Sequence, residues 1–378
     1  MSPANRYSPT TGNTLAAFIA LAAKANTSSI PPNAPLGGTL TVNGTTITTI
    51  GGDVLDTSNV VSTSTMISTV PPPGATIPPD VASMAGGSQP SSYGWAPNIT
   101  DSAVSFLQVI GFIDNILLDI LINGHNNLTS GSWSNLYPAT IANTMGTMAA
   151  QAIVHRSTST DSLTHYAKNV TGTCQYNYPI SSVDDFVAIS LTLILLEIAL
   201  LLDVISLVVT TDTWMIGPLS STLGSKARMA GMVNMMQNHI PAAAPREVLM
   251  PASLVYSYVN NHYVVPGSCP DSLPFASIPT LKITKQPTAG SARLSNVTVN
   301  YDASQQGSLN MAWLGAWGNV EYTPVVPDAG IAGQGTASVP TDLSGHVWGV
   351  LTNGTGAKVQ DLPGMAVAGP EIIWVSQP

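Results

Sequence analysis

The chain has few charged side chains. Of its 378 residues, 11 are basic and 20 are acidic, so charge makes up 8% of the sequence, against about 25% in ordinary soluble domains. Phosphate recognition depends on clustered Lys and Arg, and the basic residues here are spread thinly through a chain of net charge −9. The composition therefore argues against a nucleic-acid partner. An apolar content of 44% also excludes a wholly disordered chain.

Cysteine is equally scarce, with Cys174 and Cys269 as the only two. Neither belongs to a CxxC motif or lies near a histidine at ligand spacing, which argues against a structural zinc or redox motif. In an oxidising compartment an even pair most simply forms one disulfide, and two buried thiols are the alternative.

The chain is rich in Ser, Thr, Asn and Gly, whose hydroxyl and amide groups replace charged side chains as its polar groups. They create seven acceptor triplets for N-linked glycans. A single triplet is weak evidence in a Ser/Thr-rich sequence, but seven spread along the chain favour a secreted protein. The predicted glycosylation sites are Asn26, Asn43, Asn98, Asn127, Asn169, Asn296 and Asn353.

Residues 1–34 are expected to form an N-terminal arm. Its apolar run, Leu15–Ala23, has two interpretations. It resembles a short signal peptide with cleavage near Ala25, or it is a docking helix of two or three turns, and we favour the helix.

A β-hairpin is predicted within residues 35–70. Alternating β-branched residues lie on both sides of Asn43-Gly44, a two-residue turn signal. Residues 71–97 are rich in Pro, Gly and Ser and are predicted to be a stiff linker.

Residues 98–282 carry helical patterns and are predicted to form a helical bundle. The first helix has apolar residues on nearly every face, with Thr100 or Asp101 as its cap and Gly124 as its end. The others are expected at Ala139–His155, Asp184–Val209, Ser225–His239 and Ala252–Asn261. The third is nominally long enough to span a bilayer, but Glu197 and Asp203 lie in its middle, so we interpret it as a core helix and expect no transmembrane segment.

In residues 283–378 the apolar residues recur with a period of two, and this pattern predicts a β-sandwich of short strands. The expected fold class is thus α+β. Four tryptophans of this part are expected in the sandwich core, and a carbohydrate-stacking face is the alternative. They are Trp313, Trp317, Trp348 and Trp374.

Three short motifs, in order, resemble those of secreted ferritin-like proteins of fungi, the late-sexual-development and stress-response proteins. They are Cys174-Gln-Tyr176-Asn-Tyr178-Pro179, the pair Leu196-Glu197, and Ser268-Cys269-Pro270 followed by Leu273-Pro274 and Pro279-Thr-Leu281. The resemblance covers residues 98–378. It implies a ferritin-like four-helix bundle, secretion, and pairing of the two cysteines.

A ferritin-like dimetal centre needs several inward-pointing carboxylates and histidines, and most are missing here. Asp114, His155 and Glu197 remain as vestigial candidates, while Lys226 and Met229 stand at the ligand positions of the fourth helix. We expect the three remnants to form a hydrogen-bonded core network rather than hold an ion.

The sequence contains no G-x-S-x-G, H-E-x-x-H or P-loop motif. Four further histidines are expected at the surface or at helix ends, namely His165, His239, His262 and His346. We therefore expect a non-enzymatic, extracellular or cell-wall structural protein without a cofactor, which assembles with itself and has cell-wall polysaccharide as a further candidate partner. The alternative is a metal-binding protein or oxidative metalloenzyme with one iron, manganese or zinc ion.

Overall fold

The computed structural model describes residues 39–42, 45–48, 71–133, 139–237, 239–242, 244–285, 296–305, 307–315 and 318–375. The chain divides into two compact units, Met1–Ser64 and Thr65–Pro378, and each is described by itself. Helices come first in the larger unit and two antiparallel sheets follow, so the fold is of the α+β class that the sequence predicts.

The smaller unit contains a two-stranded antiparallel hairpin. β1 (Thr39–Val42) pairs with β2 (Thr45–Thr48), and Val42 lies opposite Thr45. This is the register that the alternation of β-branched residues predicts. The predicted N-terminal arm, including Asn26, lies outside the described residues, and so does Asn43.

The segment predicted as a linker carries a short helix, α2 (Pro79–Ala85). Proline suits the first helical position because the missing N–H has no partner there in any case. Ile77 and Val81 are buried, and Gln151 Nε2 of α4 donates a hydrogen bond to the Ala85 carbonyl over 3.2 Å. Residues 71–97 therefore belong to the folded unit and are not a free spacer.

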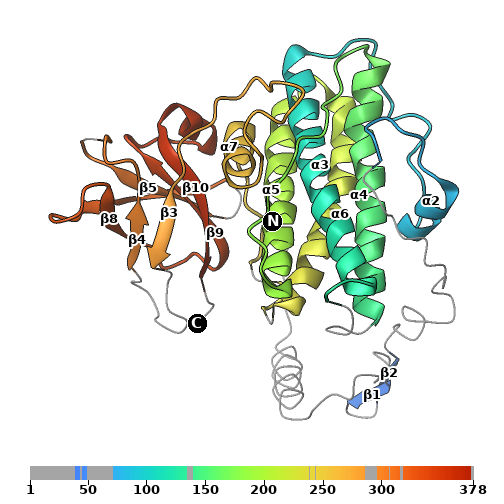
Figure 1. The fold of residues 1–378 in the computed structure, drawn as a ribbon, viewed down its shortest axis with the longest axis horizontal. Helices are drawn as coiled ribbons and strands as arrows, with labels where there is room; N and C mark the ends of the chain where they lie inside the picture. Colours follow the sequence, from blue (N-terminus) through green and yellow to red (C-terminus); the bar gives the residue numbers. More distant parts are fainter. Residues whose placement is uncertain are drawn as a thin grey trace, which may run out of the picture. The chain divides into compact units, whose positions relative to one another are not determined.

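Four long helices form the main helical part of the larger unit (Figure 1). Each is apolar over much of its circumference, as expected of helices that pack against several neighbours. α3 packs on α4 and α5, and α6 packs on α5. Their bounds are α3 (Asp101–Thr129), α4 (Ala139–His165), α5 (Val183–Val208) and α6 (Ile216–Met236).

Side chains close by in the sequence cap the N-termini of two of these helices. Thr100 Oγ1 accepts a hydrogen bond from the Ala103 amide at the start of α3, which confirms the predicted cap. At the start of α5, Ser182 and Asp185 form a reciprocal capping box. Both helices therefore start where the sequence signal predicts.

The predicted end of α3 at Gly124 is wrong, because the helix continues to Thr129. A side chain at Gly124 would overlap the ring of Phe186 on α5, so this glycine permits close packing and does not end the helix. α4 also runs ten residues beyond the predicted His155, and the Ser159 and Thr164 hydroxyls in this extension donate to backbone carbonyls one turn earlier. α6 starts nine residues before the predicted Ser225, after a 3-10 turn, η2 (Thr213–Met215).

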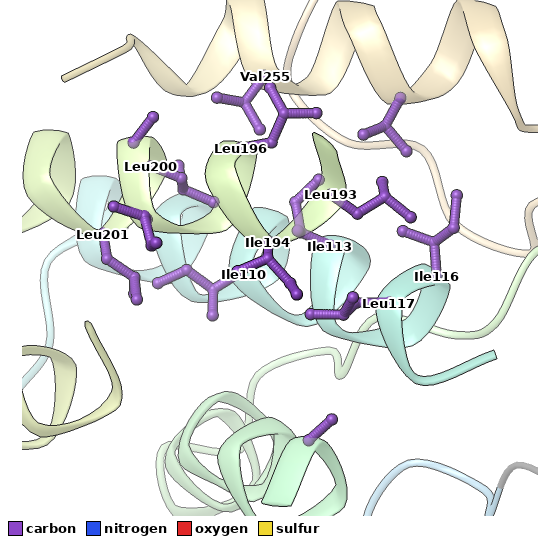
Figure 2. Close-up of a cluster of buried hydrophobic side chains, with 14 of the residues drawn as sticks. Ile110, Ile113, Ile116, Leu117, Leu193, Ile194, Leu196, Leu200, Leu201 and Val255 are labelled. Carbon is purple, nitrogen blue, oxygen red and sulfur yellow. The ribbon is translucent and has the colours of Figure 1, made fainter. Parts of the chain in front are cut away.

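The core between α3 and α5 is made of aliphatic side chains. Figure 2 shows Ile113 and Ile116 of α3 beside Leu193 and Leu196 of α5, with Val255 above them. All five are buried. Val255 belongs to α7 (Ala252–His262), which contacts α3, α5 and β10 (Ala366–Val375).

The C-terminal part contains two four-stranded antiparallel sheets, in the orders β10-β9-β5-β6 and β3-β4-β8-β7. The first consists of β5 (Asn310–Leu314), β6 (Val320–Pro324), β9 (Gly345–Thr352) and β10 (Ala366–Val375). The second consists of β3 (Lys282–Lys285), β4 (Asn296–Asn300), β7 (Val326–Pro327) and β8 (Gln334–Ser338).

The first sheet is buried on both faces, as β5 illustrates. Met311 and Trp313 join a cluster with residues of the second sheet, whereas Ala312 and Leu314 join the core of the helices. Side chains alternate between the faces of a strand, so this sheet is a middle layer between the helices and the second sheet.

Two helices, α3 and α5, are long and apolar enough to cross a membrane by length and composition. Most residues of both apolar stretches are buried against other parts of the chain.

Candidate functional site

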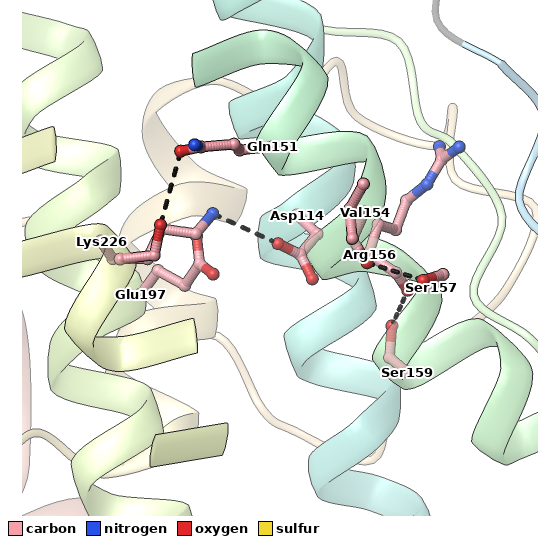
Figure 3. Close-up of polar contacts among 9 residues, drawn as sticks. Asp114, Gln151, Val154, Arg156, Ser157, Ser159, Glu197 and Lys226 are labelled. Atoms are coloured by element: carbon pink, nitrogen blue, oxygen red, sulfur yellow. Dashed lines mark hydrogen bonds and ion pairs between the residues drawn. The ribbon is translucent and has the colours of Figure 1, made fainter. Parts of the chain in front are cut away.

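A lysine lies fully buried between two carboxyl groups in the helical core. Lys226 Nζ of α6 is 2.5 Å from Glu197 Oε2 of α5 and 3.6 Å from Asp114 Oδ1 of α3. The exposed fraction of all three side chains is 0 or 1%. Figure 3 shows the three side chains converging from different helices. We call Asp114, Glu197 and Lys226 the buried triad.

The triad holds two acids and one base away from water. Burial raises the pKa of Asp114, and the Lys226 charge opposes this rise. Burial also raises the pKa of Glu197 to about 8. The Lys226 charge opposes this rise, whereas the Asp114 charge adds to it. One ammonium balances one carboxylate, so the triad is neutral when the two carboxyls hold one proton between them.

Arg156 brings a second buried cation close to the triad. Its Nη1 donates to Asn115 Oδ1 over 3.1 Å, and its Nη2 donates to the Pro71 carbonyl over 2.7 Å. The Arg156 charge also lowers the pKa of Asp114. The guanidinium thus ties α4 to α3 and to the start of the Pro-rich segment.

His155, the third predicted remnant, does not complete the network. Its Nδ1 is buried and has no hydrogen-bond partner among the residues that the structure describes. Burial and the charges of Lys226 and Arg228 lower its pKa well below the usual value, so the imidazole is neutral. The structure brings together Asp114 and Glu197 but joins them through Lys226, whereas the sequence predicts a network with His155.

The donor set does not fit a ferritin-type dimetal centre. Within the described ranges, no group of three or more His, Cys, Asp and Glu side chains is placed to hold a metal ion. The Lys226 ammonium also lies against both carboxyls, where it repels a divalent cation. Sequence reasoning placed Lys226 at a ligand position but missed its ion pairs, and it missed Arg156 although a lone Arg inside a helix pattern is a usable signal.

The two cysteine motifs meet in space, since Cys174 and Cys269 form a disulfide. The segments around it also pair through their backbones. Asn177 N donates to the Tyr263 carbonyl over 2.7 Å, and Val265 N donates to the Gln175 carbonyl over 2.9 Å. The disulfide therefore joins the segment after α4 to the segment after α7.

The three tryptophans that the structure describes in the C-terminal part do not form an open carbohydrate-stacking face. Trp313 and Trp348 are fully buried, which confirms the core interpretation for these two and excludes them from sugar stacking. Trp374 is half-buried and stacks on His239 with ring centroids 3.9 Å apart. Trp317 lies outside the described residues.

The remaining histidines have structural contacts. His165 is exposed and stacks on Trp95, with ring centroids 4.1 Å apart. His262 Nε2 lies 3.8 Å from Glu371 Oε2, an acid more than a hundred residues away in the sequence. Burial lowers the pKa of His346 to about 4. The His262 contact thus joins α7 to β10, whereas the His165 contact joins α4 to the segment before α3.

Among the predicted glycosylation sites, four asparagines are exposed: Asn98, Asn169, Asn296 and Asn353. Asn127 is half-buried in the last turn of α3, and its Nδ2 donates to the Asn123 carbonyl over 3.0 Å. A glycan on Asn127 would leave Nδ2 with a single hydrogen for this bond.

Two pockets lie away from the buried triad. A polar pocket of about 250 Å³ lies beside Asn169 and Asp271, near the disulfide. A smaller pocket of about 80 Å³ lies between α6 and the first sheet, at Asn234 and His346. Neither includes a triad side chain. No protein-family model matches the chain, and no curated protein is significantly similar to it.

Proposed function

We propose that the chain is a non-enzymatic, secreted and glycosylated structural or cell-surface protein of a fungus, which assembles with copies of itself. In this proposal a ferritin-like bundle and a β-sandwich module act as a scaffold, without a cofactor, outside the cell or in the cell wall. The buried triad is the observation that carries the proposal. The Lys226 nitrogen, covalently attached to the chain, takes the place between two carboxyls where a metalloenzyme would need its cation.

Self-assembly is supported by the low charge of the chain. A net charge of −9 spread over 378 residues gives little repulsion between copies at physiological salt. Large apolar side chains are also exposed at the ends of α5 and α6 and beside β7. They are Leu207, Val209, Met235, Ile240, Val326 and Ile331.

The hairpin offers the better edge for strand pairing between copies. β1 and β2 form a two-stranded sheet, so each has an unpaired edge within it, and neither contains a proline. In contrast, β7 carries Pro327 and β6 ends at Pro324, which remove donors from these edge strands.

Sedimentation velocity over a range of concentrations tests the assembly. We expect oligomers that grow with concentration and change little between low and high salt. Thr41→Pro, which removes a donor from β1, is expected to reduce assembly. Thr41→Val, which keeps the backbone N–H of β1 and a β-branched side chain, is the matched control and should leave assembly unchanged. Monomers alone at the highest concentration would overturn the self-assembly proposal.

A second candidate function is a metal-binding protein or oxidative metalloenzyme. The convergence of Asp114 and Glu197 favours it, because two buried carboxyls with a neighbouring histidine are common metal donors. Elemental analysis of the purified protein distinguishes the two functions. Iron, manganese or zinc at one ion per chain would support the metalloprotein and overturn the scaffold proposal.

A further inference from the structure

The buried triad also has the composition and geometry of a site for amide-bond formation. A primary amine lies 2.5 Å from one carboxyl oxygen and 3.6 Å from an oxygen of a second carboxyl group. The three groups come from α6, α5 and α3. An amine in contact with two carboxyls has a nucleophile, an electrophile and a proton acceptor in one place.

The surroundings of the buried triad exclude water and disfavour charged forms of its side chains. The three side chains have exposed fractions of 0 or 1%, and their sequence neighbours Ile113, Leu196 and Ile198 are buried as well. Neither pocket described above reaches the triad. An ion pair in such a place loses the hydration of both partners, so a reaction that removes the charges is favoured.

We propose that the Lys226 and Asp114 side chains join in an intramolecular isopeptide bond, which cross-links α6 to α3, with Glu197 as the group that accepts the proton. Glu197 has this role because its Oε2 is the atom in contact with Nζ. Asp114 is the electrophile because its carboxyl lies beside Nζ without accepting its proton. The distance from Nζ to Oδ1 is 3.6 Å, which is longer than an N–H···O hydrogen bond.

The reaction balances without an oxidant, reductant or co-reactant. The Glu197 carboxylate takes one proton from the Lys226 ammonium. The free electron pair of Nζ then forms a bond to Cγ of the protonated Asp114 carboxyl. The C–O bond to the hydroxyl breaks, and this oxygen leaves as water with a proton from Nζ. The products are an amide, one water molecule and an uncharged Glu197 carboxyl.

Proximity supplies the driving force that amide formation lacks in bulk water. Groups held in contact by a rigid framework react with effective concentrations of about 10⁵–10⁸ M. The triad side chains are shielded from solvent, so bulk water, which would favour hydrolysis of the amide, does not reach them. The bond would connect two helices separated in the sequence by α4 and α5.

Mass spectrometry of proteolytic peptides from the purified, full-length protein tests this bond. The expected result is a branched peptide that contains Lys226 and Asp114 and weighs one water less than the two separate peptides. Glu197→Gln, which keeps the shape of the side chain but accepts no proton, is expected to give the two peptides unlinked. Asp119→Asn, on the same helix as Asp114 but bonded to Tyr178, should retain the link.

Two results would overturn the proposal. One is a wild-type protein in which both peptides occur only unlinked, and this result does not depend on whether any variant folds. The other is a branched peptide whose fragments join Lys226 to Glu197, or a link that persists in folded Glu197→Gln. The bond does not depend on the proposed structural role, so monomeric protein in sedimentation would leave the inference standing.

Discussion

Among single residues, Asp203 is a buried acid that differs from the two acids of the triad. Hydrogen-bond donors stabilise its carboxyl, and no cation among the described residues does so. Its Oδ2 accepts from the Ala252 amide at the start of α7, over 3.3 Å. Its Oδ1 accepts from Gln360 Nε2 of η3 (Val359–Gly364), over 3.3 Å. Asp203 thus connects α5 with the first turn of α7, whose cap residue is a proline, and with the C-terminal part.

The burial of Asp203 predicts a pH dependence of stability. Burial raises its pKa from 3.8 to about 6, and the two hydrogen bonds oppose the rise. Between these values the folded chain keeps a proton that the unfolded chain has lost, so the free energy of unfolding falls as pH rises. From pH 4.5 to 6.5 we expect a fall of about 2 kcal/mol from this group.

Urea unfolding of the wild type and of Asp203→Asn at both pH values measures this contribution. The variant should lack only the share of Asp203. The difference between the two proteins isolates this share from Glu197, whose raised pKa acts in the same direction, and from His346, whose lowered pKa acts in the opposite direction over the same range. Parallel pH profiles for the two proteins would contradict the assignment.

At the scale of elements, the spacing of α3 and α5 depends on Gly124. Phe186 lies against the glycine and is fully buried, and its ring is 5.2 Å from that of Trp133 between centroids. The ring therefore has no free space into which to move. Helix-forming propensity favours alanine over glycine, but here packing decides the residue.

Gly124→Ala is expected to destabilise the protein by about 1–3 kcal/mol, because the added methyl group overpacks the contact with Phe186. Gly224→Ala is the matched control within a helix. A side chain at Gly224 meets nothing within 4 Å, so this change should stabilise α6 by up to about 1 kcal/mol. Chemical denaturation measures both, and equal effects would contradict the packing argument.

At the scale of the whole larger unit, one core joins the helices to the first sheet. Trp348 of β9 is fully buried among the residues of the helical core. Its ring meets that of Tyr258 on α7 edge to face, with centroids 5.3 Å apart. We therefore expect the helices and the sheets to unfold together.

Trp348→Ala is expected to cost about 3–5 kcal/mol, the range for a fully buried aromatic side chain. Helical circular dichroism and tryptophan fluorescence should fall in a single transition in both the wild type and the variant. Trp374→Ala, at a half-buried position, should cost less. Separate transitions for the two signals would show that the helical and sheet parts are independent.

Local signals in the sequence predicted an element well where its ends depend on residues close by in the sequence. The cap at Thr100, the strands on both sides of Asn43-Gly44 and the start of α7 are examples. Boundaries that depend on another element were missed. Gly124 was read as a helix end because its neighbour Phe186 lies some sixty residues further along the chain.

For the candidate site, the sequence provided the residue types but not their partners. The ligand pattern of ferritin-like proteins singled out Asp114 on α3, Glu197 on α5 and Lys226 on α6. It paired the acids with His155, yet the tertiary structure pairs them with Lys226. Which of the two basic groups lies between the acids depends on the rotation of α4 and α6 about their axes.

The sequence by itself determined the α+β class, the low charge and the apolar helices, since these follow from composition and from periods of 3.6 and 2. Only the tertiary structure decided that α3, α5 and α6 bring an amine and two carboxyls together in a dry core. That arrangement depends on helix packing distances and rotations, which are set by contacts between residues far apart in the chain and by no local pattern.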